Sequence, residues 1–192
     1  MKRVIIALCI LLLPVAAFAQ FQIGPTAYYN FPLLEGGEMD IPEVQGIDSS
    51  DFTFGADARL KLAIFQVSGL ALFTPGFIAD DYSYYWPPSI DIFLDAGVAF
   101  DIAFLRLGLG FGPNFSFFLL GDEYGSAEFS DPVSFGTNLR ATADIVLGGV
   151  SFGLSYLMQF DFELGEATAQ QILDADKTQG LLGISVLLQL GG

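Results

Sequence analysis

The chain has 192 residues, enough for one domain, and is 53% hydrophobic with a mean hydropathy of +0.55. It carries 22 Asp and Glu residues against 7 Lys and Arg residues, a balance that argues against nucleic acid as a partner. No stretch after residue 20 is apolar over the roughly 18 residues that a transmembrane helix needs.

The N-terminus has the three parts of a secretory signal peptide. Lys2 and Arg3 supply a positive start, residues 4–15 form an apolar run, and an A-x-A cleavage site ends at Ala19. The run is short for a membrane span. We therefore predict that residues 1–19 are a signal peptide, with an uncleaved N-terminal anchor as the alternative.

Cys9 lies inside this apolar run and is the only cysteine of the chain. Only five residues separate it from Arg3, too few for the apolar region that precedes a lipoprotein cysteine. The predicted mature chain, residues 20–192, therefore has no thiol and no disulfide.

The mature chain repeatedly alternates apolar and polar residues with the period of a β-strand. In residues 52–64, apolar side chains alternate with Asp57, Arg59 and Lys61, so one face is apolar and the other charged. The same alternation predicts five further strands, at 90–102, 105–117, 135–147, 150–162 and 182–190. Residues 21–31 and 67–77 alternate less regularly, and the second segment is apolar on both faces, so its outer face stays unassigned.

The connections between these eight segments alternate in length. Tight turns are expected near residues 65–66, 103–104 and 148–149. The long polar connections cover residues 33–51, 78–89, 119–133 and 164–179. We predict an all-β fold, an eight-stranded antiparallel up-and-down transmembrane β-barrel of a bacterial outer membrane, with short turns and both termini in the periplasm.

A soluble eight-stranded barrel is the main alternative. It would carry its apolar face inside and polar residues outside. Interleaved charges of both signs, together with many glycines on the same face, suit a small lumen in which charges pair. With the signal peptide, this favours the membrane barrel.

The mature chain resembles the small outer-membrane barrels of the OmpX, OmpA-barrel and OmpW types in strand count, connection asymmetry and alternation. Residues 183–190 resemble the C-terminal signal read by the barrel assembly machinery, although the final aromatic residue is missing and Gly191 and Gly192 follow. The resemblance implies a monomer whose partners are outer-membrane lipid and, during biogenesis, that machinery. A host or environmental ligand at the loops stays open.

The charged residues predicted to face the lumen are the first candidate site. They are Asp57, Arg59, Lys61, Asp95, Asp101, Arg106, Arg140 and Asp144. Paired charges that plug a narrow barrel are one interpretation, because buried ions need partners and eight strands leave little room beyond the side chains. A selective conduit or a proton-linked pathway is the other, since Gly108, Gly110 and Gly112 leave space.

Aromatic residues gather in the second long connection. They are Tyr82, Tyr84, Tyr85 and Trp86. They fit an aromatic girdle at the outer membrane interface, and contact with a ligand or host surface is the alternative.

The first long connection is rich in carboxylates: Glu35, Glu38, Asp40, Glu43, Asp48 and Asp51. Calcium loops follow a D-x-D-x-D-G pattern that does not occur here, so a solvated acidic loop is expected. The long connections hold one base, Lys177.

Three prolines, Pro25, Pro75 and Pro113, sit beside glycines within predicted strands. Proline removes a ladder hydrogen bond, so we expect kinks or bulges there. The OmpW resemblance implies that such breaks could open a lateral gap for apolar solutes.

Enzymatic function is not expected. The chain has no histidine and its predicted mature form no cysteine, so the usual general bases and nucleophiles are missing. No cofactor or metal is predicted. Two functions stay open: a structural or surface-interaction barrel with a charge-plugged lumen, and a narrow channel for small or hydrophobic solutes.

Overall fold

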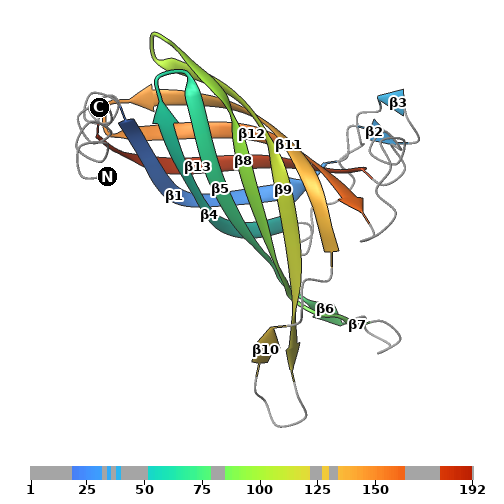
Figure 1. The fold of residues 1–192 in the computed structure, drawn as a ribbon. Helices are drawn as coiled ribbons and strands as arrows, with labels where there is room; N and C mark the ends of the chain where they lie inside the picture. The colour runs from blue at the N-terminus through green and yellow to red at the C-terminus, as the bar shows by residue number, and fades with distance from the viewer. Residues whose placement is uncertain are drawn as a thin grey trace, which may run out of the picture.

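The computed structural model describes residues 19–31, 34–35, 38–39, 52–78, 85–121, 127–129, 134–162 and 178–191. Eight long strands form one closed antiparallel barrel (Figure 1). In ring order they are β1 (Ala19–Asn30), β4 (Phe52–Leu62), β5 (Phe65–Thr74), β8 (Ser89–Ile102), β9 (Leu105–Gly121), β11 (Ser134–Leu147), β12 (Val150–Phe162) and β13 (Thr178–Leu190). Pairing of β13 with β1 closes the ring, with Phe21 opposite Leu190. The predicted fold class is therefore confirmed.

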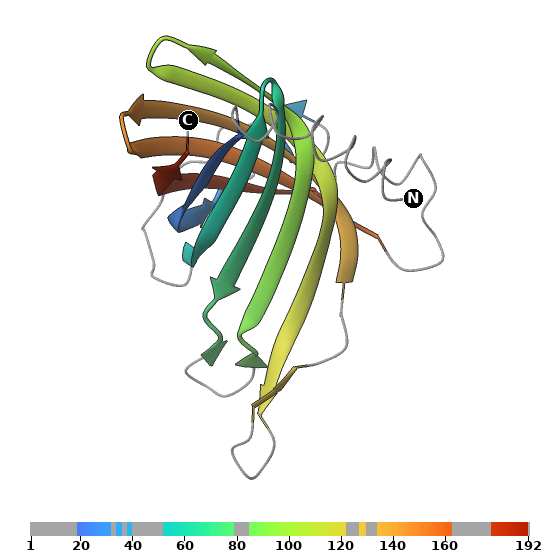
Figure 2. The same cartoon turned by 60° about the vertical axis from the view of Figure 1, so that its left-hand side comes forward.

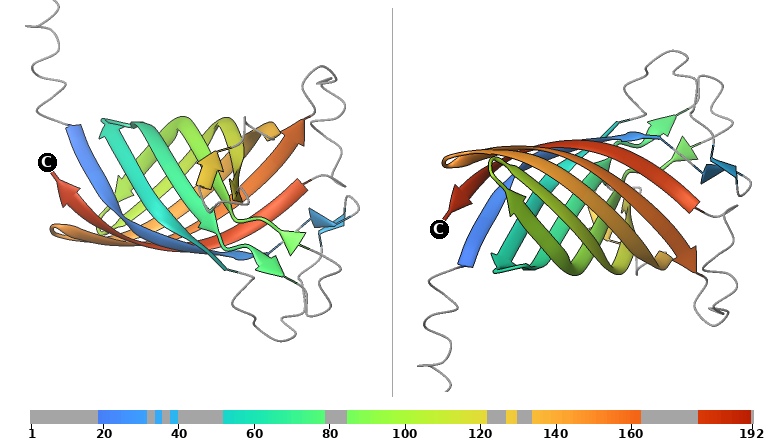
Figure 3. Two further views of the ribbon diagram at one scale, coloured as in Figure 1. Left: turned by 90° about the horizontal axis from the view of Figure 1, so that it is seen from below. Right: turned by 90° about the horizontal axis from the view of Figure 1, so that it is seen from above.

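Two-residue turns join three strand pairs at the end of the barrel where β1 begins and β13 ends (Figure 3). The turns at Ala103–Phe104 and Gly148–Gly149 lie where they were predicted. The expectation of a turn at residues 65–66 is wrong, because the chain turns at Ala63–Ile64 and Phe65 already begins β5. Ala63 and Ala103 both have a φ of 56°, a conformation that alanine rarely adopts, so neither of these two turns is marked by glycine or proline.

Within the described residues, three of the four long connections contain short strands, which lie toward the opposite end of the barrel (Figure 1). The first contains β2 (Leu34–Glu35) and β3 (Glu38–Met39), which pair with each other. The second contains β6 (Phe77–Ile78) and β7 (Tyr85–Trp86), and the third contains β10 (Ala127–Phe129). β10 pairs with the last residues of β9, so this hairpin extends beyond the other barrel strands (Figure 2).

The apolar side chains point away from the barrel. Phe111, Leu154 and Ile184, on three different strands, are 55%, 51% and 65% exposed. The residues that alternate with the exposed ones along each strand point into the lumen. This arrangement is opposite to that of a soluble barrel, whose apolar face is inside. A band of exposed apolar side chains around a closed barrel suits hydrocarbon as the surrounding solvent.

The structure also settles the two strands whose alternation was weak. In β1, Gln22, Thr26 and Tyr28 are buried in the lumen, while Phe21 and Ile23 face outward. In β5 the lumen face carries Gln66, Ser68, Leu70 and Leu72, and Val67 and Phe73 are exposed. The lumen face of β5 is thus polar near its turn and apolar further along the strand.

Candidate functional site: the barrel lumen

All eight charged residues predicted for the lumen lie within the described part of the chain. Strand pairing brings several to the same level: Asp101 stands opposite Arg106, and Arg106 opposite Asp144, across three consecutive strands. Seven of the eight are buried, namely Asp57, Arg59, Lys61, Asp95, Arg106, Arg140 and Asp144. Asp101, at the end of β8 beside a turn, keeps 37% of its side chain exposed.

The central group of these residues forms one ion-pair network. Arg59 donates from Nη2 to Asp57 Oδ2 at 2.7 Å and from Nη1 to Asp144 Oδ2 at 2.7 Å. Arg140 donates from Nη2 to Asp57 Oδ1 at 3.0 Å, and its Nε lies 3.4 Å from Asp95 Oδ2. Two guanidinium groups thus share Asp57, which offsets part of the cost of burying its charge.

This network spans the width of the lumen. Strands β4 and β11 stand opposite each other in the ring of eight, with three strands between them on either side. Arg59 on β4 contacts Asp144 on β11, and Arg140 on β11 contacts Asp57 on β4. The ion pairs therefore tie opposite walls together.

A second group lies at the turn end of the lumen. Asp101 accepts a hydrogen bond from Arg106 Nε at 2.6 Å and pairs with Lys61 through its other oxygen. Arg106 also donates to the side-chain oxygen of Gln20 on β1, another strand opposite its own. This group is closer to solvent than the central network, because Asp101 is partly exposed.

Uncharged polar side chains beside the central network form hydrogen bonds with one another. Gln22 donates to Ser151 Oγ at 2.8 Å, and Ser155 shares a 2.8 Å hydrogen bond with the hydroxyl of Tyr28. Both contacts join β1 to β12 across the lumen side of β13. They complete a polar layer around the charges.

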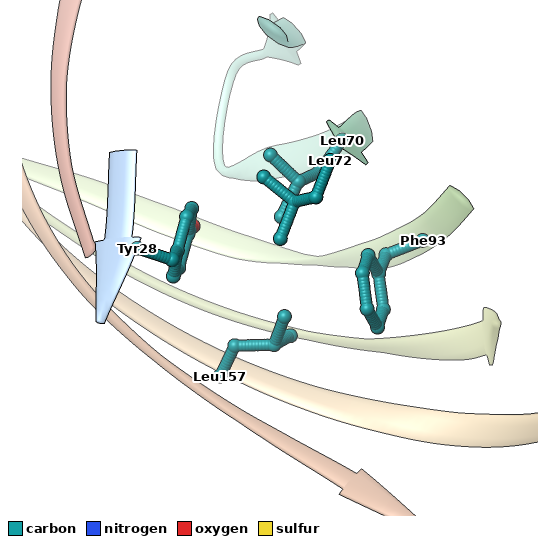
Figure 4. Close-up of a cluster of buried hydrophobic side chains, with 5 residues drawn as sticks. All are labelled: Tyr28, Leu70, Leu72, Phe93 and Leu157. Atoms are coloured by element: carbon teal, nitrogen blue, oxygen red, sulfur yellow. The ribbon is translucent and has the colours of Figure 1, made fainter. Parts of the chain in front are cut away.

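An apolar layer lies directly on the loop side of the charges. Its five buried side chains come from four strands and point toward one another (Figure 4). They are Tyr28, Leu70, Leu72, Phe93 and Leu157. Leu70 stands opposite Asp57, and Phe93 follows Asp95 by one lumen position toward the loops, so the two layers are in contact.

The sequence did not reveal this apolar layer. Leu70 and Leu72 sit in the segment that is apolar on both faces, where alternation cannot assign the inner side. Leu157 and Phe93 are the only large apolar residues on the predicted lumen faces of their strands. Large apolar residues that recur at lumen-facing positions of several strands were the sequence feature that could have predicted this layer.

Three solved structures similar to this chain are of small outer-membrane barrels. Ail, the attachment invasion locus protein of Yersinia pestis, crystallised with the heparin analogue sucrose octasulfate, matches 90% of this chain and 97% of its own, with 14% identity and a TM-score of 0.52. A second crystal structure of Ail has a TM-score of 0.48 at 12% identity, covering 90% of this chain and 97% of that one. Neisserial surface protein A has a TM-score of 0.48 at 14% identity, covering 88% and 96%.

This chain has the fold of the small eight-stranded outer-membrane β-barrels. No protein-family model matches the chain, and no match was found among curated proteins. A structural likeness at 14% identity establishes the fold alone, so the function has to be argued from the residues. Within the described ranges, no helix is long and apolar enough to cross a membrane.

The aromatic residues of the second connection are only partly placed in this barrel. Tyr82 and Tyr84 lie outside the described residues. Tyr85 and Trp86 form β7 and pair with Ile78 and Phe77 on the loop end of the barrel. A girdle and a ligand surface both stay predictions. The carboxylates of the first connection fall on β2, on β3 or outside the described residues.

The prolines interrupt strand pairing at two positions of the barrel. The pairing of β1 with β13 is interrupted at Gly24 and Pro25, and the pairing of β8 with β9 is interrupted at Gly112 and Pro113. Pro75 instead follows the end of β5, so the expectation that it lies inside a strand is wrong. Proline has no N–H to donate, which accounts for the interruptions at the first two sites.

An apolar groove of about 570 Å³ lies on the outer surface over the β1–β13 pairing. Its lining includes Pro25, Ala27, Ile184 and Val186, with Phe54 on β4 at one flank and Ile145 on β11 at the other. The groove forms where small side chains lie beside large ones on the outer wall of the barrel. In the described part of the chain, no group of three or more His, Cys, Asp or Glu side chains is placed to hold a metal ion.

Proposed function

We propose that this protein is an integral barrel of the bacterial outer membrane with a closed lumen and a structural or surface-interaction role. One observation carries the proposal: the lumen is crossed by the Arg59–Asp144 ion pair and, one layer further, filled by five apolar side chains. An ion would have to displace a buried ion pair and then enter an apolar layer. Both steps carry large desolvation costs.

The loop end is the surface that remains for contact with other molecules. Only six of the 22 acids lie on the eight barrel strands: Asp57, Asp91, Asp95, Asp101, Asp144 and Asp161. The others fall in the long connections, whose single base is Lys177. Ail was crystallised with a polysulfated sugar. Charge complementarity disfavours such an anion here and favours basic partners.

Planar-bilayer recording tests the closed lumen. The purified protein is expected to give no stepwise current. A variant with both layers trimmed, Arg59→Ser with Arg140→Ser, Leu70→Ala and Phe93→Ala, is expected to conduct if it folds. Steady current through the unmodified protein would overturn the closed-lumen proposal. Refolding of each variant is checked by circular dichroism before recording.

The predicted orientation places the long connections outside the cell and both termini in the periplasm. The predicted mature chain has no cysteine, so single cysteines can report on it. A membrane-impermeant maleimide applied to intact cells should label Ser126→Cys in the third connection and spare Ile64→Cys at a turn. The reverse pattern would contradict the orientation.

Surface contact is tested by binding to the reconstituted barrel. A cationic peptide such as polylysine is expected to bind in a salt-sensitive manner, and heparin is not. Binding of heparin at physiological salt would contradict the preference for basic partners.

A second candidate function is passage of small apolar solutes along the membrane-facing wall. The apolar groove over the β1–β13 pairing favours this function, because the pairing of these strands is interrupted at Gly24 and Pro25, beneath the groove. Uptake of a labelled hydrophobic solute should then fall on deletion of the gene and return with the unmodified chain. Unchanged uptake would exclude this role.

A further inference from the structure

We infer that the lumen contains a binding site for one water molecule, in a small cavity between strands β5, β8, β9 and β11. The cavity offers about 10 Å³ to the centre of a water molecule, the space of a single water. It lies beside the central ion-pair network and shares Arg140 and Asp95 with it.

Strand register brings the polar residues of this cavity together. Gln66 stands opposite Gly97, and Gly97 stands opposite Gly110 on the next strand. Arg140 pairs with Gly110, and Thr142 pairs with Gly108. Four neighbouring strands thus present their lumen faces to one point.

The cavity exists because both lumen-facing positions of β9 at this level are glycine. A methyl group on Gly108 would lie 2.5 Å from Thr142 Oγ1, and one on Gly110 would lie 2.9 Å from Asp95 Cβ. Both glycines line the cavity. Any other residue at these positions would fill or distort the space.

Four buried polar atoms around the cavity have no hydrogen-bond partner among the described residues. They are Gln66 Oε1, Asp95 Oδ1, Arg140 Nη1 and Thr142 Oγ1. Their residues are between 1% and 8% exposed. The remaining polar atoms of Asp95 and Arg140 are engaged elsewhere, since Asp95 Oδ2 accepts from Ser68 and Arg140 Nη2 donates to Asp57.

The chemistry of these four atoms selects water over an ion. The Arg140 guanidinium opposes a cation, and the carboxylate of Asp95 with the amide oxygen of Gln66 opposes an anion. A water molecule can donate to both oxygens and accept from Arg140 and Thr142. Buried waters typically make about three such bonds, and each unsatisfied group would otherwise carry a desolvation cost.

A crystal structure of the full barrel at about 2 Å tests the site directly. A solvent peak within about 3.2 Å of at least three of the four atoms is expected. Crystals soaked in rubidium or bromide should show no anomalous peak there. No peak in the unsoaked crystal, or an anomalous peak after either soak, would overturn the inference.

The direction in which Thr142→Val changes the stability of the barrel is a second test, and it needs no crystal. Thr142→Val keeps the shape and removes the hydroxyl. If the hydroxyl binds water, the unfolding equilibrium constant in lipid vesicles should rise about fivefold. If the hydroxyl has no partner, its removal should leave that constant unchanged or lower it, which would overturn the inference.

Thr137→Val is the matched control on the same strand. Thr137 Oγ1 is also buried and without a partner among the described residues, but Thr137 does not line this cavity. Its substitution should not raise the unfolding constant. Equal rises in both variants would show a general effect of threonine loss and would overturn the assignment of water to Thr142.

Discussion

Arg59 donates to Asp144 at 2.7 Å from a strand on the opposite side of the barrel. The same guanidinium holds Asp57 on its own strand, two residues away. The contact between Arg59 and Asp144 crosses the lumen, because β4 and β11 do not pair directly in the sheet. The ion pair thus links opposite walls of the barrel, and its loss should lower the stability of the whole barrel.

Arg59→Met should lower the free energy of unfolding by about 3–5 kcal/mol, because it leaves Asp144 and part of Asp57 buried without a counter-charge. Urea unfolding of the barrel in lipid vesicles measures this. Lys61→Met at the turn end is the control, and about 1 kcal/mol or less is expected because its partner Asp101 is partly exposed and keeps Arg106. Equal losses would contradict the central role of Arg59.

Leu70→Ala should cost about 2–5 kcal/mol, since Leu70 is 1% exposed within the apolar layer. Val67→Ala, on the outer face of the same strand, should cost less because the side chain of Val67 is 57% exposed and its truncation leaves no cavity in the packed lumen. The Leu70 variant should still pass no current, because the ion pairs remain. Conduction by this single variant would show that the apolar layer alone closes the lumen.

Gly24→Ala should destabilise the barrel by about 3 kcal/mol or more, or prevent its closure. A Cβ at this position would lie 1.9 Å from the backbone oxygen of Val186, a residue held in place by its pairing with Phe152 on β12. Gly69→Ala is the control, because its Cβ would lie 3.7 Å from the flexible side chain of Leu94. Heat-modifiable migration on gels reports closure, and equal behaviour of the two variants would contradict the close approach at Gly24.

Leu109→Arg should cost about 2–4 kcal/mol, as expected for a cation on the lipid face near the bilayer midplane. Leu109 is 52% exposed on the outer wall of β9. Ile64→Arg, at a turn, should cost about 0–1 kcal/mol because it reaches the interface. Unfolding from vesicles measures both, and a reversed order would place the membrane at a different height on the barrel.

The sequence alone determined the strands, the outer faces of the six regular ones and the charged residues of the lumen. A strand turns alternate side chains to opposite faces, so an apolar face such as that of residues 52–62 can be assigned without knowing its neighbours. The alternation of short and long connections likewise predicted the up-and-down topology. The turn at Ala63–Ile64 was placed two residues too late, because the apolar alternation of β4 continues through the turn to Ile64.

Only the tertiary structure decided which charges meet, where the lumen is apolar and which wall is hollow. These features depend on the stagger between strands, which sets Arg59 level with Asp144 across the ring and Gly108 beside Thr142. They also depend on which face of β5 turns inward, a choice that its two apolar faces leave undecided in the sequence. Alternation is a property of one strand, whereas pairing across a lumen is a property of the closed ring.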